Sequence, residues 1–160
     1  MKRIVTLSLA LFLLLGLTTA GLAETATLES GLEINLEGMP IVNEPVEFTI
    51  MAYVPTGAES YEKLLFTEEM EARTGVHINW IEVSAVNEKV NLALASGDLP
   101  DAFFKCSITT TILEKYAPDG VFVPLNDYLE TYMPAFNAAL EKYSDLGPSI
   151  ATSDGTIYGV

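Results

Sequence analysis

The side chains that most often perform catalysis are few in this sequence and lie far apart. The only histidine, His77, sits between two apolar residues in a strand-like stretch, and the only cysteine, Cys106, has no suitable partner. Adjacent carboxylates occur at Glu68 and Glu69, on a segment that we expect to be an exposed helix. Glycoside hydrolases use two carboxylates, but nothing singles out a pair here. The sequence therefore predicts no catalytic residue, no metal site and no cofactor.

Strand-like and helix-like segments alternate along the middle of the chain. The predicted strands are Val46–Tyr53, Val76–Val83 and Ala102–Phe104. The predicted helices are Glu59–Thr74, with Tyr61, Leu64, Leu65 and Met70 on one face, a helix capped by Ser84 and ended by Gly97, and Thr109–Tyr116. Trp80 lies in mid-strand, where we expect it to pack in the core. This order favours an α/β domain with a largely parallel sheet.

The segments after residue 120 are shorter. We expect one helix that is capped by Asn126 or Asp127 and ends at Tyr132, and another from Pro134 to about Tyr143. Residues 149–152 and 156–160 flank an Asp-Gly pair, which predicts a β-hairpin. Because Val160 stops in or just after an apolar β-run, we expect the chain to be the front part of a longer protein.

The N-terminus has the pattern of a secretory signal peptide. Lys2 and Arg3 precede an apolar run of 14 residues, Ile4–Leu17, and Gly21-Leu22-Ala23 fits a signal peptidase site, with a cut after Ala20 as the alternative. The run is shorter than the roughly 20 residues of a membrane-spanning helix. We therefore expect residues 1–23 to be removed, 24–44 to form a flexible linker and 45–160 to fold, with the protein exported to the periplasm or cell surface.

Acidic residues outnumber basic ones. Their balance gives a net charge of −14, and loss of Lys2 and Arg3 with the signal peptide makes it −16. Nucleic acids and anionic membranes need basic patches, so neither is an expected partner. We expect a monomer. Since Cys106 lies far from the apolar run, it cannot serve as a lipid-anchor cysteine at the cleavage site.

Four short motifs in this order resemble those of extracellular solute-binding protein family 1, the sugar-binding subunits of bacterial ABC importers. The resemblance covers about residues 46–160 and is closest to the lipoprotein-type, oligosaccharide-binding branch. The motifs are Glu71-Ala72-Arg73-Thr74-Gly75-Val76, then Leu92-Ala93-Leu94-Ala95-Ser96-Gly97-Asp98-Leu99-Pro100-Asp101, then Asp119-Gly120-Val121-Phe122-Val123-Pro124-Leu125-Asn126, and Ser153-Asp154-Gly155-Thr156-Ile157-Tyr158-Gly159. The glycines and prolines in them are also explained by turns and helix ends.

The resemblance implies a periplasmic-binding-protein-like (type II) fold of two α/β lobes that close on a sugar. This chain would cover part of the first lobe. Sugar sites combine aromatic faces with hydrogen-bonding groups, and ligands of open α/β sheets bind beyond the carboxyl ends of the strands. The candidate substrate-binding residues are therefore Tyr53, Thr56, Asp101, Lys105, Ser107 and Tyr158.

The function that the resemblance implies is capture of a sugar or oligosaccharide by hinge closure, without chemistry, and its delivery to the transmembrane subunits of an ABC permease. Two alternatives remain open at this point. One is a secreted enzyme that acts on polysaccharides, and the other is a ligand-binding sensor or adhesion module.

Overall fold

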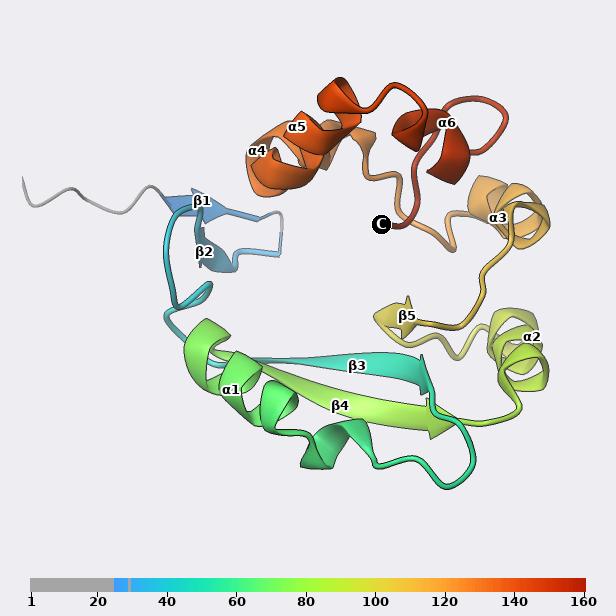
Figure 1. The fold of residues 1–160 in the computed structure, drawn as a ribbon, viewed down its shortest axis with the longest axis horizontal. Helices are drawn as coiled ribbons and strands as arrows, with labels where there is room; N and C mark the ends of the chain where they lie inside the picture. Colours follow the sequence, from blue (N-terminus) through green and yellow to red (C-terminus); the bar gives the residue numbers. More distant parts are fainter. Residues whose placement is uncertain (1–24, 29) are drawn as a thin grey trace, which may run out of the picture.

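A computed structural model describes residues 25–28 and 30–160 (Figure 1). The predicted signal peptide lies outside the described residues. The helices and strands that surround the functional region are β3 (Val46–Tyr53), α1 (Leu65–Thr74), β4 (Val76–Val83), α2 (Val86–Ser96) and β5 (Ala102–Phe104). The alternation of strands and helices confirms the predicted α/β class.

The central sheet has three parallel strands in the order β4-β3-β5. Their bounds are those predicted from the sequence. Ile50 in β3 is paired with Trp80 in β4 and with Ala102 in β5, which sets the register of all three strands. The chain passes from β3 to β4 on one side and then returns to pair β5 with the other side of β3. The strand order therefore reverses beside β3.

The two faces of the sheet carry different helices. Met51 and Val83 point to one face, where they pack with α2 through Val90, Ala93 and Leu94. This cluster, which also contains Cys106, is the best-buried apolar core around the sheet. Helix α1 lies against the other face, where Ile50 and Trp80 point. The buried residues of α2 are Val90, Ala93 and Leu94, which lie on one face of the helix, and Val90 is only 1% exposed.

Glycines end both crossover helices, as predicted. Gly75 after α1 and Gly97 after α2 have φ of 78° and 75°, in the left-handed region that L residues with a side chain disfavour. Each glycine N–H donates to a carbonyl in the last turn of its helix. The chain can then turn directly into the next strand or loop.

Two details of the predictions for the first two helices are wrong. Residues 59–74 do not form one helix: a 3₁₀ turn, η1 (Tyr61–Lys63), is followed by Leu64 in an extended conformation, and α1 begins only at Leu65. The predicted shared face is therefore lost, and Leu65 is 68% exposed. Ser84 does not cap α2, because the residue before this helix is Ala85 and no side chain bonds to its free amides.

The C-terminal part consists of short helices. They are α3 (Thr110–Tyr116), η2 (Ala117–Asp119), η3 (Asn126–Tyr128), α4 (Leu129–Tyr132), α5 (Pro134–Lys142) and α6 (Leu146–Ile150). The side chain of Thr109 caps α3 by accepting from the Ile112 amide. Neither Asn126 nor Asp127 caps the segment that follows, which begins as a 3₁₀ turn with no side-chain cap.

The predicted hairpin at residues 149–160 is reduced to a single antiparallel bridge between Ala151 and Ile157. Ser149 and Ile150 belong to α6 instead. The side chain of Asn126 holds the turn from outside: its Nδ2 donates to the Gly155 carbonyl at 3.2 Å, and its Oδ1 accepts from the Ile157 amide at 2.9 Å. A tertiary contact thus takes the place of the missing strand pairing.

Residues expected as a linker carry a small hairpin of β1 (Thr25–Thr27) and β2 (Glu33–Asn35). The segment that follows contacts the end of α1, where the amides of Ile41 and Val42 donate to the Thr74 carbonyl at 2.9 and 3.2 Å. Val42 is 3% exposed. This stretch is therefore tied to the α/β body.

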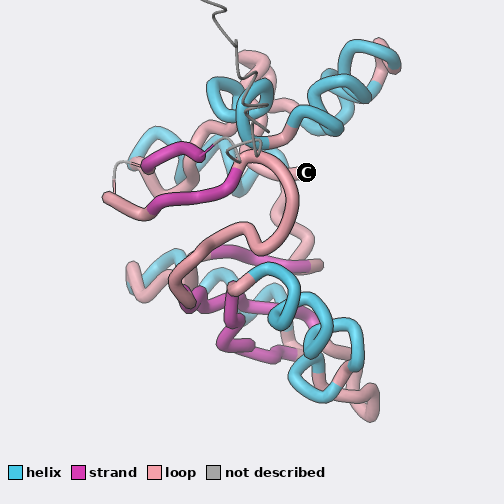
Figure 2. The backbone as a smooth tube through the Cα atoms, turned by 90° about the vertical axis from the view of Figure 1, so that its left-hand side faces the viewer, coloured by secondary structure: helices cyan, strands magenta, loops and turns pink. Residues whose placement is uncertain are grey.

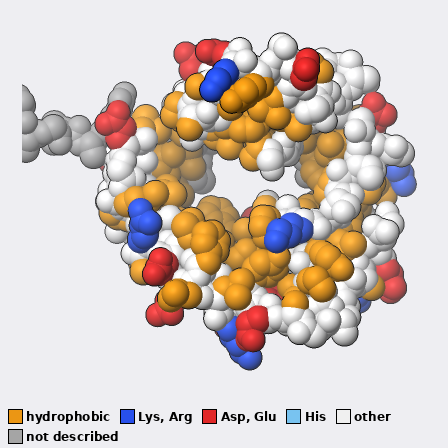
Figure 3. Space-filling view, viewed as in Figure 1, with side chains coloured by type: hydrophobic (Ala, Val, Ile, Leu, Met, Phe, Trp, Pro, Cys, Tyr) orange, Lys and Arg blue, Asp and Glu red, His pale blue; other side chains and the backbone are white. Residues whose placement is uncertain are grey.

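The sheet with α1 and α2 lies on one side of the molecule, and α4, α5 and α6 lie on the other (Figures 1 and 2). Figure 3 shows an opening in the middle of this view, bordered by hydrophobic side chains, with acidic side chains around the outer edge. Over the described residues, no helix has the length and apolar character needed to cross a bilayer.

Candidate functional site

The candidate site lies where β3 and β5 end next to each other, and we call it the carboxyl edge: Tyr53 at the end of β3, residues 54–56 after it, and residues 105–107 after β5. Ala52 is paired with Phe104, so Tyr53 and Lys105 follow on adjacent strands. The strand order reverses at this point because β4 lies on the far side of β3. Loops diverge at such a reversal and leave a crevice, which is where open α/β sheets bind ligands.

Two of the three residues after β5 have an unusual backbone. Lys105 and Ser107 have φ of 55° and 52°, which is uncommon for residues other than glycine. Cys106 between them is 3% exposed, and its thiol lies 3.3 Å from the Met51 carbonyl oxygen and 3.4 Å from that of Phe104. Burial raises the pKa of this thiol, so it stays protonated and can donate. The anchored cysteine leaves its two neighbours exposed at the edge.

An aromatic cluster of Tyr61, Trp80 and Phe104 lies beside the carboxyl edge. Tyr61 is stacked on Trp80 with ring centroids 4.8 Å apart, and Phe104 meets Tyr61 edge-on at 5.7 Å. The Lys105 ammonium is 5.2 Å from the Phe104 ring centroid and 5.7 Å from that of Tyr61, within cation–π range. The cluster therefore fixes the position of a positive charge at the edge.

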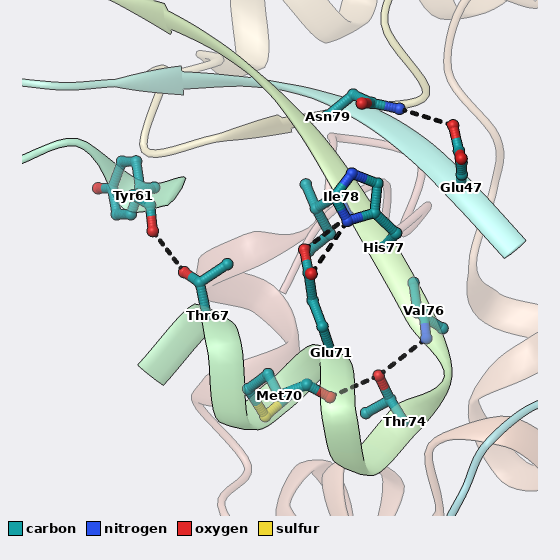
Figure 4. Close-up of polar contacts among 10 residues, drawn as sticks. All are labelled: Glu47, Tyr61, Thr67, Met70, Glu71, Thr74, Val76, His77, Ile78 and Asn79. Atoms are coloured by element: carbon teal, nitrogen blue, oxygen red, sulfur yellow. Dashed lines mark hydrogen bonds and ion pairs between the residues drawn. The ribbon is translucent and has the colours of Figure 1, made fainter. Parts of the chain in front are cut away.

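Several hydrogen bonds hold Tyr61 in place. Its hydroxyl donates to the Tyr53 carbonyl at 3.3 Å, and its amide donates to the Glu82 carboxylate at 2.6 Å. Its carbonyl accepts from the Thr67 hydroxyl at 2.6 Å (Figure 4). The Glu82 carboxylate also accepts from Ser60. Tyr61 is thus tied to β3, to β4 and to α1 at once.

A groove of about 560 Å³, which we call the α1 groove, runs between α1 and this face of the sheet. Its lining is mostly apolar and includes Ile50, Ile78 and Trp80. Among its lining residues, Lys105 is the only basic one and Glu71 the only acidic one. Trp80 packs in the aromatic cluster, and within the described chain its Nε1–H is shielded from solvent without a hydrogen-bond partner.

The structure places three of the six predicted site residues at the neighbouring ends of β3 and β5: Tyr53, which is half-buried, and the exposed Lys105 and Ser107. Thr56 is also exposed, but it lies in the loop after β3, where the Val54 amide donates to the Val83 carbonyl at the end of β4. Sequence reasoning did not identify Tyr61, Phe104 or Glu82. Trp80 and Phe104 belong to different predicted strands, β4 and β5. Only the pairing of both strands with β3 shows that the two side chains lie on the same face of the sheet.

Asp101 and Tyr158 are not brought to this group. Asp101 precedes β5 at the opposite end of the strand, where its carboxylate accepts from the Thr49 amide at 2.7 Å and its own amide donates to the Thr49 carbonyl at 2.8 Å. Tyr158 packs edge-on against Phe122 at 6.4 Å, and Phe122 in turn contacts Phe103. The contacts of Asp101 connect the start of β5 to β3, and those of Tyr158 connect the C-terminal segment to Phe122.

His77, near the start of β4, is paired with Glu71 of α1, as Figure 4 shows. Its Nδ1 lies 3.0 Å from one Glu71 oxygen, and the other oxygen accepts from the Ile78 amide at 3.1 Å. The hydrogen bond to Glu71 and its charge raise the His77 pKa above 6.5, with Glu47 and Glu62 adding to the effect. Burial would raise the Glu71 pKa, but the bonds from His77 and Ile78 outweigh it and lower that pKa. The pair fastens α1 to β4.

The described part of the chain contains no candidate metal-binding site. No group of three or more histidine, cysteine, aspartate or glutamate side chains there could hold an ion. The arrangement at the carboxyl edge consists instead of hydroxyls, an ammonium group and aromatic rings. Such groups bind and orient a polar ligand.

The profile of the bacterial extracellular solute-binding protein family matches residues 55–160. The fructooligosaccharide ABC transporter substrate-binding protein FusA of Streptococcus pneumoniae serotype 4 is 31% identical over 129 residues, which cover 79% of this chain and 24% of FusA. The chain thus spans about a quarter of the length of this relative.

Solved structures give the same picture. FusA of S. pneumoniae in complex with kestose superposes with a TM-score of 0.66 at 29% identity, over 71% of this chain and 24% of FusA. Alginate-binding protein AlgQ2 without calcium ion gives 0.62 at 26% identity, over 72% and 24%. These neighbours are type II periplasmic solute-binding proteins, and the match covers part of a lobe. On this family profile and these structures, the chain belongs to the bacterial extracellular solute-binding proteins.

Proposed function

We propose that this chain provides part of the first lobe of an extracytoplasmic solute-binding subunit of an ABC importer, which captures a sugar or oligosaccharide and delivers it to the membrane permease. The printed names of the relatives support this class of ligand: FusA is named for fructooligosaccharides and AlgQ2 for alginate. In this proposal residues 1–23 are a cleaved export signal, residues 45–160 belong to the lobe, and the protein acts as a monomer.

The observation that carries the proposal is the carboxyl edge. The Lys105 ammonium lies over the Phe104 ring there, and the hydroxyl-bearing Thr56 and Ser107 follow the ends of β3 and β5, where the strand order reverses. Aromatic faces suit the C–H surface of a sugar ring, and hydroxyls suit its hydrogen-bonding rim. A second lobe that closes over this edge would exclude water from the ligand, as in hinge closure. Tyr53, Thr56, Lys105 and Ser107 are the residues that we assign to this contact.

A titration of the full-length protein with an oligosaccharide panel tests the proposal. The panel contains kestose and longer fructooligosaccharides, neutral gluco- and galacto-oligosaccharides, and uronic acid oligosaccharides. Calorimetry should find at least one ligand that binds. If no oligosaccharide in the panel binds, the proposal is refuted.

A pair of variants tests the location. Ser107→Gly keeps the left-handed backbone and removes the hydroxymethyl side chain, so the affinity should fall about two- to tenfold, as expected for the loss of one hydrogen bond. Asp98→Asn is the matched control, because Asp98 is an exposed residue before the opposite end of β5. Equal losses in the two variants would place the ligand elsewhere.

The enzyme alternative is separated by an assay for reducing sugar. The protein incubated with any oligosaccharide that it binds should release no new reducing ends. Steady release that depends on protein concentration would favour a secreted polysaccharide-active enzyme instead.

A further inference from the structure

We propose that Lys105 makes the carboxyl edge selective for acidic oligosaccharides, with its ammonium group binding the carboxylate of a uronic acid residue. This inference rests on the proposed function and names the class of ligand. It begins from the place of Lys105, which is the first residue after β5 and lines the α1 groove beside the reversal of strand order.

The backbone at Lys105 is held in a conformation that costs free energy. Its φ of 55° and that of Ser107 at 52° flank the buried thiol of Cys106. Strained backbone of this kind persists only where the surrounding structure enforces it, and it concentrates at functional sites. Here the buried Cys106 thiol lies 3.3 Å from the Met51 carbonyl oxygen on the neighbouring strand, which ties this turn to β3. An ordinary extended residue after β5 would point the side chain elsewhere.

The ammonium group is positioned but not neutralised. It lies 5.2 Å from the Phe104 ring centroid and 5.7 Å from that of Tyr61, and Tyr61 is itself fixed by Tyr53, Glu82 and Thr67. Between residues 25 and 160, apart from the undescribed Glu29, Lys105 has no ion pair and no hydrogen bond to another residue. Its three N–H donors are therefore free for a ligand.

The chemistry of an ammonium group favours a charged acceptor. Hydrogen bonds from lysine to a carboxylate are roughly twice as strong as bonds between neutral groups. The chain is strongly acidic, with a net charge of −14, so an anionic ligand needs a local positive charge to offset the wider repulsion. The rings beside the ammonium offer an apolar face to the sugar that carries the carboxylate. A neutral sugar would gain little from a lysine at this position.

The test compares acidic oligosaccharides with their neutral methyl esters. Calorimetry on the full-length protein uses oligogalacturonate, oligomannuronate and oligoguluronate, each beside its methyl ester. For at least one of the three, the acid should bind about tenfold more tightly than the ester, or better. This preference should weaken as salt concentration rises.

Variants assign the preference to Lys105. Lys105→Met keeps an unbranched apolar side chain beside the rings but removes the charged ammonium group, and it should abolish the difference between acid and ester. Lys105→Arg keeps the charge and should retain at least part of the preference, which guards against a simple folding defect in the first variant. Lys89→Met is the matched control: Lys89 is exposed on α2, so the net charge changes equally without touching the edge.

The outcomes separate this inference from the proposed function. Tight binding of neutral oligosaccharides without any preference for acids would overturn the role of Lys105 and leave the proposed function standing. Equal weakening of acid and ester by Lys105→Met would do the same. Absence of binding to every sugar would remove the proposed function and this inference with it.

Discussion

Replacing Gly75 with alanine tests how the segment before the sheet is held to the end of α1. Gly75 has φ of +78°, and a Cβ added there would lie 2.9 Å from the Val42 carbonyl oxygen and 3.0 Å from Val42 Cγ2. Gly97 has φ of +75°, and its Cβ would meet no atom within 4 Å. The two glycines end helices in the same way, so Gly97→Ala is a matched control for backbone strain.

The expected magnitudes differ because only one variant has a collision. A left-handed alanine costs about 1–2 kcal/mol of folding free energy in either position. In Gly75→Ala the contact with a backbone oxygen must also be relieved, which displaces Val42. Full burial of a valine side chain stabilises by about 1.5–3 kcal/mol, and partial loss of that burial sets the scale. Gly75→Ala should therefore cost about 1–3 kcal/mol more than Gly97→Ala.

Two measurements check this reasoning. Urea unfolding gives the difference in free energy between the variants. Hydrogen exchange gives its location, because the amides of Ile41 and Val42 donate to the Thr74 carbonyl and should exchange faster in Gly75→Ala only. Equal destabilisation of the two variants, with unchanged exchange at residues 41–42, would refute the argument.

Two further predictions concern polar contacts. Because the pKa of His77 is raised, the stabilisation from protonated His77 is fully present below pH 6.5 and is lost as the pH rises through the raised pKa. Because the pKa of Glu71 is lowered, the stabilisation from ionised Glu71 is fully present above pH 4.5 and is lost as the pH falls through the lowered pKa. His77→Gln should therefore reduce the change of melting temperature with pH between pH 6 and 8. A variant with the same pH dependence as the wild type would contradict this. Asp101→Ala should destabilise by about 1–3 kcal/mol in urea unfolding because the Thr49 amide loses its acceptor, whereas Asp101→Asn keeps an acceptor and should cost less; equal losses would argue against the hydrogen bond.

Local sequence patterns were enough to predict the strands of the sheet. Strand-forming residues mark Val46–Tyr53 and Val76–Val83, and glycines after α1 and α2 mark the ends of both helices. These features depend on residues near one another in the chain. The first residue of a helix is harder to predict. The extended backbone at Leu64 and the missing cap at Ser84 depend on how each helix is connected to the preceding element, not on the residues of the helix alone.

Part of the candidate site could also be predicted, because residues that follow β3 and β5 were expected to line the ligand. Tyr61 and Phe104 could not be found in this way. Tyr61 reaches the edge through its stacking on Trp80 and its bond to the Tyr53 carbonyl, both of which cross between elements. Asp101 shows the converse, since an exposed-looking carboxylate has a backbone partner on the neighbouring strand.

The sequence alone therefore indicates which segments are strands and helices, and which family the chain resembles, since these follow from short-range periodicity and motifs. The order β4-β3-β5, the register beside β3 and the left-handed backbone around Cys106 are long-range properties. They arise only when side chains distant in the chain pack together. For that reason the tertiary structure alone places Lys105 above two aromatic rings at the carboxyl edge.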